Sequence, residues 1–157
     1  IWDKLCKRKL YQGLVPPQFA MGEDLVITMQ LTLKANNISI INEPLYHYFF
    51  NRSSITKVQT EEKRYTNWKQ SISNASKALY FLSQYGLQNK LMTEIIYLKY
   101  KQKKLLGKLA FNKKYAGEWI DCFSEINTKC LALNQLTVVE RLKFYVTLCT
   151  SYLNSIR

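Results

Sequence analysis

The sequence holds only one histidine, His47, and its four cysteines show no Cys-x-x-Cys spacing. Zinc sites are built mainly from closely spaced cysteine and histidine, so we expect no zinc site and assign no metal ligand. Three of the cysteines fall within apolar helical patterns, where a reduced cysteine behaves as a small hydrophobic residue. This use of cysteine favours a reducing, cytoplasmic compartment.

Long apolar runs are also missing from the chain. No run approaches the roughly 18 residues that a membrane-spanning helix needs, and no signal peptide is recognisable at the first residues. We therefore expect a cytoplasmic protein that is soluble or peripheral at the inner face of the cell membrane. The sequence begins Ile-Trp-Asp, without an initiating methionine and inside an amphipathic pattern, which indicates a piece of a longer protein.

Acidic residues are few, 11 against 23 lysines and arginines, which gives a formal charge of +12. Such a chain attracts polyanions, among them nucleic acid, anionic lipid, and sugar or nucleotide phosphates. The basic tract over 99–114 shows neither a helix-turn-helix arrangement nor an RNA-binding aromatic signature. It therefore favours a solvated helix face or contact with an anionic membrane surface, and nucleic acid is not expected as a partner.

Apolar periodicity predicts helices over much of the chain. Leu25, Met29 and Leu33 recur every four residues and predict a helix over 23–35. A stripe from Trp68 to Leu82 predicts a second helix, with Gly86 as its C-terminal cap. Further apolar positions predict helices around 91–98 and 119–126.

The last helix is expected to open on a capping box, Thr137-Val-Val-Glu140, in which the hydroxyl and the carboxylate each bond the other residue's amide. We predict its buried face from the apolar residues that follow at helical spacing, namely Val138, Leu142, Tyr145, Cys149 and Tyr152.

Two short segments before residue 51 read as strands. Residues 38–41 (ISII) form a β-branched run, and residues 45–50 (LYHYFF) form an aromatic extended segment after a proline. The order of helix, strand and strand predicts an α+β first part, followed by a helical remainder from about residue 61.

Glu23 and Asp24 stand together behind Gly22 in this basic chain. In one interpretation they only stabilise a helix start, where acidic residues interact favourably with the amide dipoles by about 0.3 to 1 kcal/mol. In the other, a carboxylate is held at the helix start and accepts a proton from a nucleophile.

The segment 46–54 (YHYFFNRSS) also has two readings. Its aromatic residues can be core filling on a strand that ends at a solvated Arg52. Alternatively, Arg52 with the hydroxyls of Ser53 and Ser54 forms a donor-rich corner suited to phosphate oxygens.

The order of these motifs resembles a known family. Three segments in this order resemble the C-terminal half of the catalytic domain in inverting family 2 glycosyltransferases of the GT-A fold. The segments are WDKLCKRKLY, GEDLVITMQLTLKANNISIINEPLYHY and NRSSIT. The resemblance covers residues 1 to about 57. It implies that Asp24 is the general base, that Glu23 supports it, and that Arg52 and Ser54 lie near the donor diphosphate. Trp2 and Lys4, from the first motif, are implied in substrate binding.

This resemblance also implies a fold and a reaction. We expect a predominantly helical α+β chain: a partial GT-A acceptor-side region with short helices and two short strands over 1–58, then a bundle-like helical extension over 59–157. The whole enzyme would transfer a sugar, with inversion, from a nucleotide-diphosphate sugar to a hydroxyl of a surface polysaccharide, lipid-linked or teichoic-type acceptor. Asp-x-Asp, the family's metal motif, is absent here. The Mn²⁺ or Mg²⁺ ion would therefore be bound mainly by the missing half, and this fragment alone is expected to be inactive.

Two other interpretations stay open. The chain can be a small basic helical module that binds nucleic acid or protein, in which Glu23 and Asp24 only cap a helix. The helical part from residue 61 can also be a homo-oligomerisation element, with the stripe of Trp68, Ile72 and Leu79 at its interface.

Overall fold

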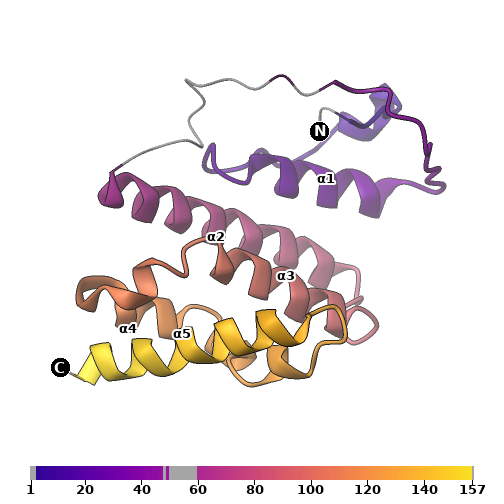
Figure 1. Ribbon diagram of the computed structural model, residues 1–157. Coiled ribbons are helices and arrows are strands. Elements are labelled where there is room, and N and C mark those ends of the chain that lie inside the picture. Colours follow the sequence, from indigo (N-terminus) through magenta and orange to yellow (C-terminus); the bar gives the residue numbers. More distant parts are fainter. Residues whose placement is uncertain (1–2, 48, 50–59, 157) are drawn as a thin grey trace. The chain divides into compact units, whose positions relative to one another are not determined.

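The computed structural model describes residues 3–47, 49 and 60–156, and this part of the chain contains helices and no strand (Figure 1). The chain divides into two compact units, Ile1–Leu87 and Gln88–Arg157. The boundary predicted at residue 58 concerned the end of a catalytic domain, and it stays a prediction. None of the described helices has the length and hydropathy of a membrane-spanning segment.

The first unit is built on two helices that pack side by side (Figure 1). The second of them begins after Thr60, whose hydroxyl accepts from the amide of Lys63 at 3.4 Å, and ends before Gly86, which has a φ of 66°. Both helices were predicted from periodicity, and both are confirmed. The elements among the described residues of this unit are η1 (Arg8–Tyr11), α1 (Glu23–Lys34) and α2 (Glu61–Gln84).

The second unit is a group of helices around three aromatic side chains. The ring of Phe144 lies 5.3 Å from that of Tyr100 and 5.9 Å from that of Trp119, and all three are buried. The elements of this unit are α3 (Met92–Lys104), η3 (Leu109–Phe111), α4 (Lys113–Asp121), η4 (Ser124–Ile126), η5 (Lys129–Ala132) and α5 (Val138–Ile156).

The predicted capping box of α5 is confirmed. The Thr137 hydroxyl accepts from the Glu140 amide at 3.2 Å, and the Glu140 carboxylate accepts from the Thr137 amide at 3.1 Å. The helix predicted around 119–126 lies earlier in the chain, because α4 covers Lys113–Asp121 and Phe123 adopts a left-handed φ of 49°. Residues Ser124–Ile126 form the separate short helix η4.

The two predicted strands are wrong, and with them the predicted α+β class and its partial GT-A region. Residues 38–47 and 49 contain no strand, and the side chains of Ile38, Ile40 and Phe49 are mostly exposed. A β-branched run becomes a strand only where a neighbouring strand takes up its backbone hydrogen bonds. Among the described residues no such neighbour is present.

The predicted buried face of α5 is also wrong. Val138, Leu142 and Tyr145 are more than half exposed, and Cys149 and Tyr152 are exposed as well. The residues of α5 that enter the core are Phe144, Leu148 and Ser151. Of the four cysteines, only Cys130 is fully buried.

Candidate functional site

The predicted acidic pair lies at the first turn of α1. Gly22 precedes it with a φ of 76° and provides no side-chain cap for the helix. One carboxylate oxygen of Asp24, Oδ1, accepts instead from the amide of Leu25 at 2.9 Å. Both Glu23 and Asp24 are exposed. The pair therefore stabilises the helix start and presents carboxylate oxygens to solvent at the same time.

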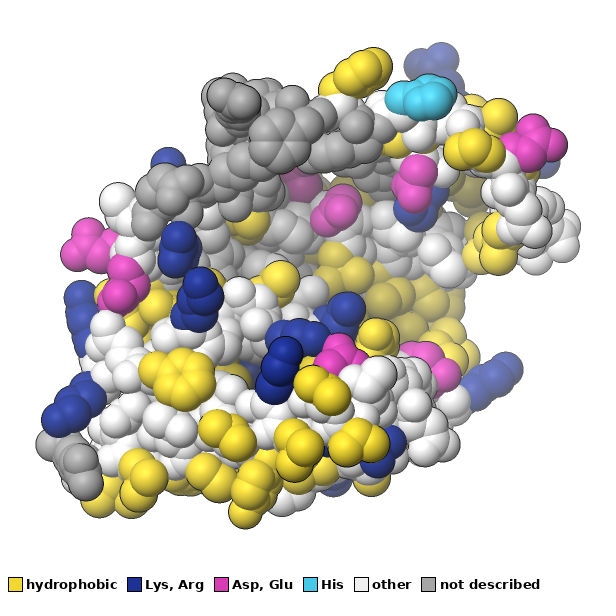
Figure 2. Space-filling model, in the orientation of Figure 1, with side chains coloured by type: hydrophobic (Ala, Val, Ile, Leu, Met, Phe, Trp, Pro, Cys, Tyr) yellow, Lys and Arg dark blue, Asp and Glu magenta, His cyan; other side chains and the backbone are white. Residues whose placement is uncertain are grey.

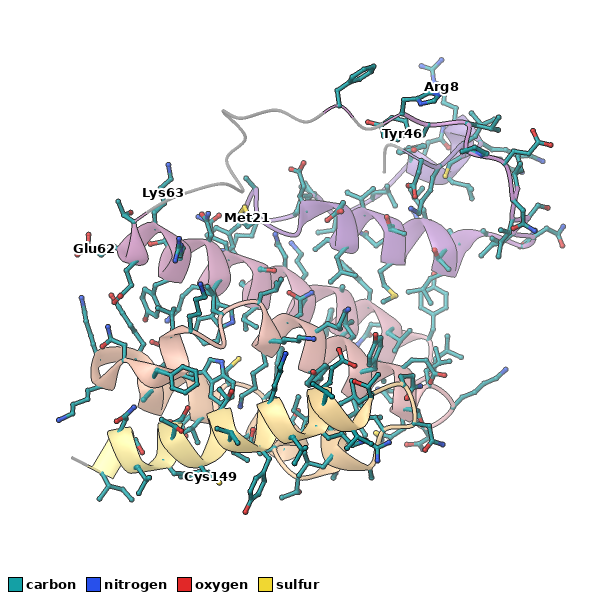
Figure 3. The ribbon with its side chains drawn as sticks, viewed as in Figure 1. Arg8, Met21, Tyr46, Glu62, Lys63 and Cys149 are labelled. Atoms are coloured by element: carbon teal, nitrogen blue, oxygen red, sulfur yellow. The ribbon has the colours of Figure 1, made fainter. Side chains whose placement is uncertain are left out.

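A buried asparagine of α2 fixes the loop that leads into this turn. Asn74 is completely buried, and its Nδ2 donates to the carbonyl oxygens of Phe19 at 2.7 Å and Met21 at 2.8 Å. Figure 3 labels Met21, at the end of this loop beside the start of α1. One turn further along α2, Lys77 donates to the carbonyl of Pro16 at 2.9 Å. These bonds tie the start of α1 to a long helix, so the direction of the acidic pair is set by the fold.

Close packing beneath the turn requires glycine at position 22. A Cβ atom built on Gly22 would lie 3.3 Å from the Ser71 hydroxyl and 3.5 Å from the Ser71 Cα. The left-handed φ is a second obstacle, because only glycine adopts it without steric cost. Gly22 thus lets the backbone approach α2 while the two carboxylates point outward.

The other end of α1 borders a cavity of about 190 Å³. Gln30 lines it and bonds Val15 in both directions, accepting from its amide and donating to its carbonyl, each at 2.8 Å. Lys34 also lines it and donates to the carbonyl of Gln12 at 2.7 Å. This volume is below the roughly 300 to 1,000 Å³ of typical ligand pockets. The side chains of Gln30 and Lys34 already bond the backbone. The cavity therefore fits a structural role better than a substrate site.

The other predicted site residues are not brought to the acidic pair by the described contacts. Lys4 is exposed and bonds its neighbour Asp3 at 2.6 Å. Trp2, Arg52 and Ser54 lie outside the described residues. No three histidine, cysteine, aspartate or glutamate side chains come together as a metal-binding group within the described part of the chain.

Sequence reasoning missed a buried lysine in the second unit. Lys103 is completely buried, and its ammonium donates to Ile120 O at 2.9 Å, Cys122 O at 2.8 Å and Asn127 Oδ1 at 2.7 Å. These acceptors include the last carbonyls of α4, so Lys103 caps that helix from a neighbouring one. Its ammonium also lies 4.5 Å from the centre of the Trp119 ring.

The electrostatics around Lys103 follow from its burial. Loss of solvation lowers the pKa of Lys103 to about 8, and the nearby Cys122 and Cys130 oppose that change. Burial likewise raises the pKa of the Cys130 thiol to about 11. With no exposed surface, this lysine cannot reach a substrate, and its role is structural. No signal in the sequence separates it from the four other lysines of residues 99–108.

Comparison with known proteins gives no further assignment. No family model matches the chain, and no curated protein or solved structure matches it either.

Proposed function

We propose that this chain is the acceptor-side part of a glycosyltransferase, with Asp24 as its general base. The enzyme would transfer a sugar from a nucleotide-diphosphate donor to a hydroxyl of a surface polysaccharide, lipid-linked or teichoic-type acceptor at the inner face of the membrane. The observation that carries the proposal is the exposed acidic pair on a helix start that α2 holds in place. The resemblance of the ordered motifs around this pair supports the same reaction.

A base for this reaction must be reachable, and its orientation must be defined. Asp24 meets both conditions, because its side chain is exposed and its Oδ1 atom is oriented by the Leu25 amide. Among the described residues its other oxygen has no hydrogen-bond partner, and this atom would accept the acceptor's hydroxyl proton. Inversion needs one base on the face opposite the departing diphosphate, so a single carboxylate is sufficient.

The proposal gives supporting roles to Glu23, to Lys4 and to three residues outside the described ranges. Glu23 would keep the local potential negative and help to orient the acceptor. Arg52 and Ser54 would lie near the donor diphosphate, while Trp2 and Lys4 would contribute to substrate binding. The divalent metal would be held mainly by the nucleotide-binding half that the resemblance implies, and it would stabilise the diphosphate leaving group.

The test is Asp24→Asn in the full-length enzyme. A positioned general base typically contributes roughly 10² to 10⁴ in rate, so we expect sugar transfer to fall by that factor. Donor binding should stay unchanged, because the substitution keeps the shape of the side chain and removes only its basicity. Transfer is measured with saturating donor and acceptor, and donor affinity by calorimetry.

Glu62→Gln is the matched control. Glu62 is also an exposed acidic residue in the first turn of a helix, that of α2 (Figure 3). This variant should transfer sugar at the wild-type rate. Wild-type turnover in Asp24→Asn, or an equal loss in Glu62→Gln, would show that Asp24 only stabilises its helix.

A further inference from the structure

The most apolar face of α5 is turned to solvent. Ile156 is 82% exposed and Val138 70%, and the residues between them on this face are exposed too. Figure 2 shows hydrophobic side chains gathered along α5, and Figure 3 shows Cys149 pointing away from the second unit. We call this row the α5 seam, and it consists of Val138, Leu142, Tyr145, Cys149, Tyr152 and Ile156.

The spacing of the α5 seam is that of a helix-pairing surface. Its members follow one another at intervals of 4, 3, 4, 3 and 4 residues, the heptad pattern of helices that pack along their length. A second exposed row, Val139, Val146 and Leu153, repeats every seven residues beside it. Neither row contains a charged residue.

The second unit cannot bury this surface by rotating α5. Ser151 donates to the carbonyl of Ala110 at 3.1 Å, and Asn154 donates to that of Phe111 at 3.0 Å. Phe144 and Leu148 are buried on the same side of the helix as Ser151. At 3.6 residues per turn, that side points roughly 120° away from the seam.

We propose that the α5 seam, with the row beside it, is the surface through which two copies of this chain associate. From their exposed fractions, the nine side chains together present on the order of 1,000 Å² of accessible surface, and a standard interface buries roughly 800 Å² of such surface per partner. The largest apolar patch of a typical monomer covers only about 300 to 600 Å². A symmetric pair brings the same surface of each copy together, so the apolar row of one copy would meet the apolar row of the other.

The charges of α5 favour a second copy over a lipid surface. A helix that lies in a membrane interface carries many lysines and arginines on its polar face. Among its described residues α5 has only Arg141 and Lys143 as cations. Arg141 donates to the Leu133 carbonyl at 2.9 Å, and Glu140 pairs with Lys104 at 2.8 Å. No charged side chain of α5 belongs to the seam or to the row beside it.

This surface differs from the stripe of Trp68, Ile72 and Leu79 that the sequence suggested for oligomerisation. Trp68 is only 4% exposed, so the stripe does not present its largest side chain to a partner.

The proposal is tested by sedimentation equilibrium of the 157-residue chain, from low micromolar to submillimolar concentration. We expect a monomer–dimer equilibrium. Leu142→Glu buries a carboxylate in the seam and should weaken the dimer by at least roughly tenfold. Lys101→Glu is the control, because it places the same side chain at an exposed position on α3, outside α5, and should leave the dimer intact.

Thiol labelling provides a readout that does not depend on a substitution. Cys149 lies in the middle of the seam, so its reaction rate should fall as the protein concentration rises. The rate at Cys6, which is far from α5 in sequence and only partly exposed, should stay constant. Circular dichroism of each variant verifies that its helices are intact.

Several results would overturn the proposal. A strict monomer at all concentrations is one, and association that Leu142→Glu leaves unchanged is another. Constant Cys149 labelling with concentration also contradicts it. A monomer that binds anionic vesicles, and loses that binding in Leu142→Glu, would assign the seam to a membrane surface.

Discussion

Replacing Lys103 by methionine removes the buried ammonium while keeping an unbranched side chain of similar length. Three hydrogen bonds from a charged donor are lost, and bonds of this kind contribute about 1.5 to 3 kcal/mol each. The gross loss is therefore roughly 6 kcal/mol. Methionine also avoids the cost of burying a charge, which a pKa of about 8 instead of 10.5 places at about 3 kcal/mol at neutral pH. We expect Lys103→Met to lower the free energy of unfolding by roughly 3 kcal/mol.

The same lysine makes stability depend on pH above neutrality. Its pKa is about 8 when folded and 10.5 when unfolded, so between these values the unfolded chain holds more protons. Stability therefore rises with pH in this window, by up to about 1.4 kcal/mol per pH unit. Cys130 acts in the opposite direction, because its folded pKa of about 11 lies above the ordinary value of 9.0. Wild-type stability should rise between pH 8 and 9 and then level off.

Urea unfolding followed by circular dichroism and tryptophan fluorescence measures both effects. Lys103→Met should lack the rise between pH 8 and 9 and should lose stability above pH 9. Lys101→Met is the control, because Lys101 is exposed on the same helix and should change stability by less than about 0.5 kcal/mol. If Lys103→Met is as stable as wild type at pH 7, or if both variants have the same pH profile, the argument about the buried ammonium fails.

Three substitutions test the local geometry of the helix ends. Gly22→Ala should lower the free energy of unfolding by about 1 to 2 kcal/mol, because a left-handed φ and a close α2 side chain both oppose the methyl group. Gly86 has a similar φ, but a Cβ there would meet nothing within 4 Å. Gly86→Ala should therefore lower the free energy of unfolding by less, as measured in the same urea titration. Glu140→Gln tests how stability depends on pH in the acidic range. Its bonds to Lys104 and then Thr137 lower the pKa of Glu140 to about 2, below its ordinary 4.5. The stability that Glu140 contributes is therefore present above pH 4.5 and lost as pH falls toward 2, so wild type should lose more in Tm over this window than Glu140→Gln. An equal loss of unfolding free energy in Gly22→Ala and Gly86→Ala would contradict the packing argument. An equal loss of Tm at low pH in wild type and Glu140→Gln would contradict the role of Glu140.

Helix positions could be predicted from the sequence where the signal is local. The capping box at Thr137 and Glu140 and the cap at Gly86 depend on residues within one turn of each other, and both are present. The start of α1 at Glu23 was visible for the same reason. What Asp24 faces is set by residues far away in the sequence, and no local pattern contains that information.

The errors concern long-range contacts. Residues 38–41 have the composition of a strand, but a strand needs hydrogen-bonding partners that the composition does not specify. The burial of Lys103 could not be predicted either, because the neighbouring lysines of the basic tract have the same chemistry. Its burial depends on where the end of α4 lies, because the free carbonyls there accept its bonds.

The misassigned face of α5 follows from physics as well. Periodicity shows which residues share a helix face, but it does not show which face meets the chain's own core. In α5 the seam carries six residues without a charge, whereas the core side includes a serine, Ser151, that bonds a backbone carbonyl. Choosing the more apolar face as the buried one therefore selected the wrong side. That choice fails in a helix whose most apolar face is exposed, and an exposed apolar patch of this kind typically marks an interaction site.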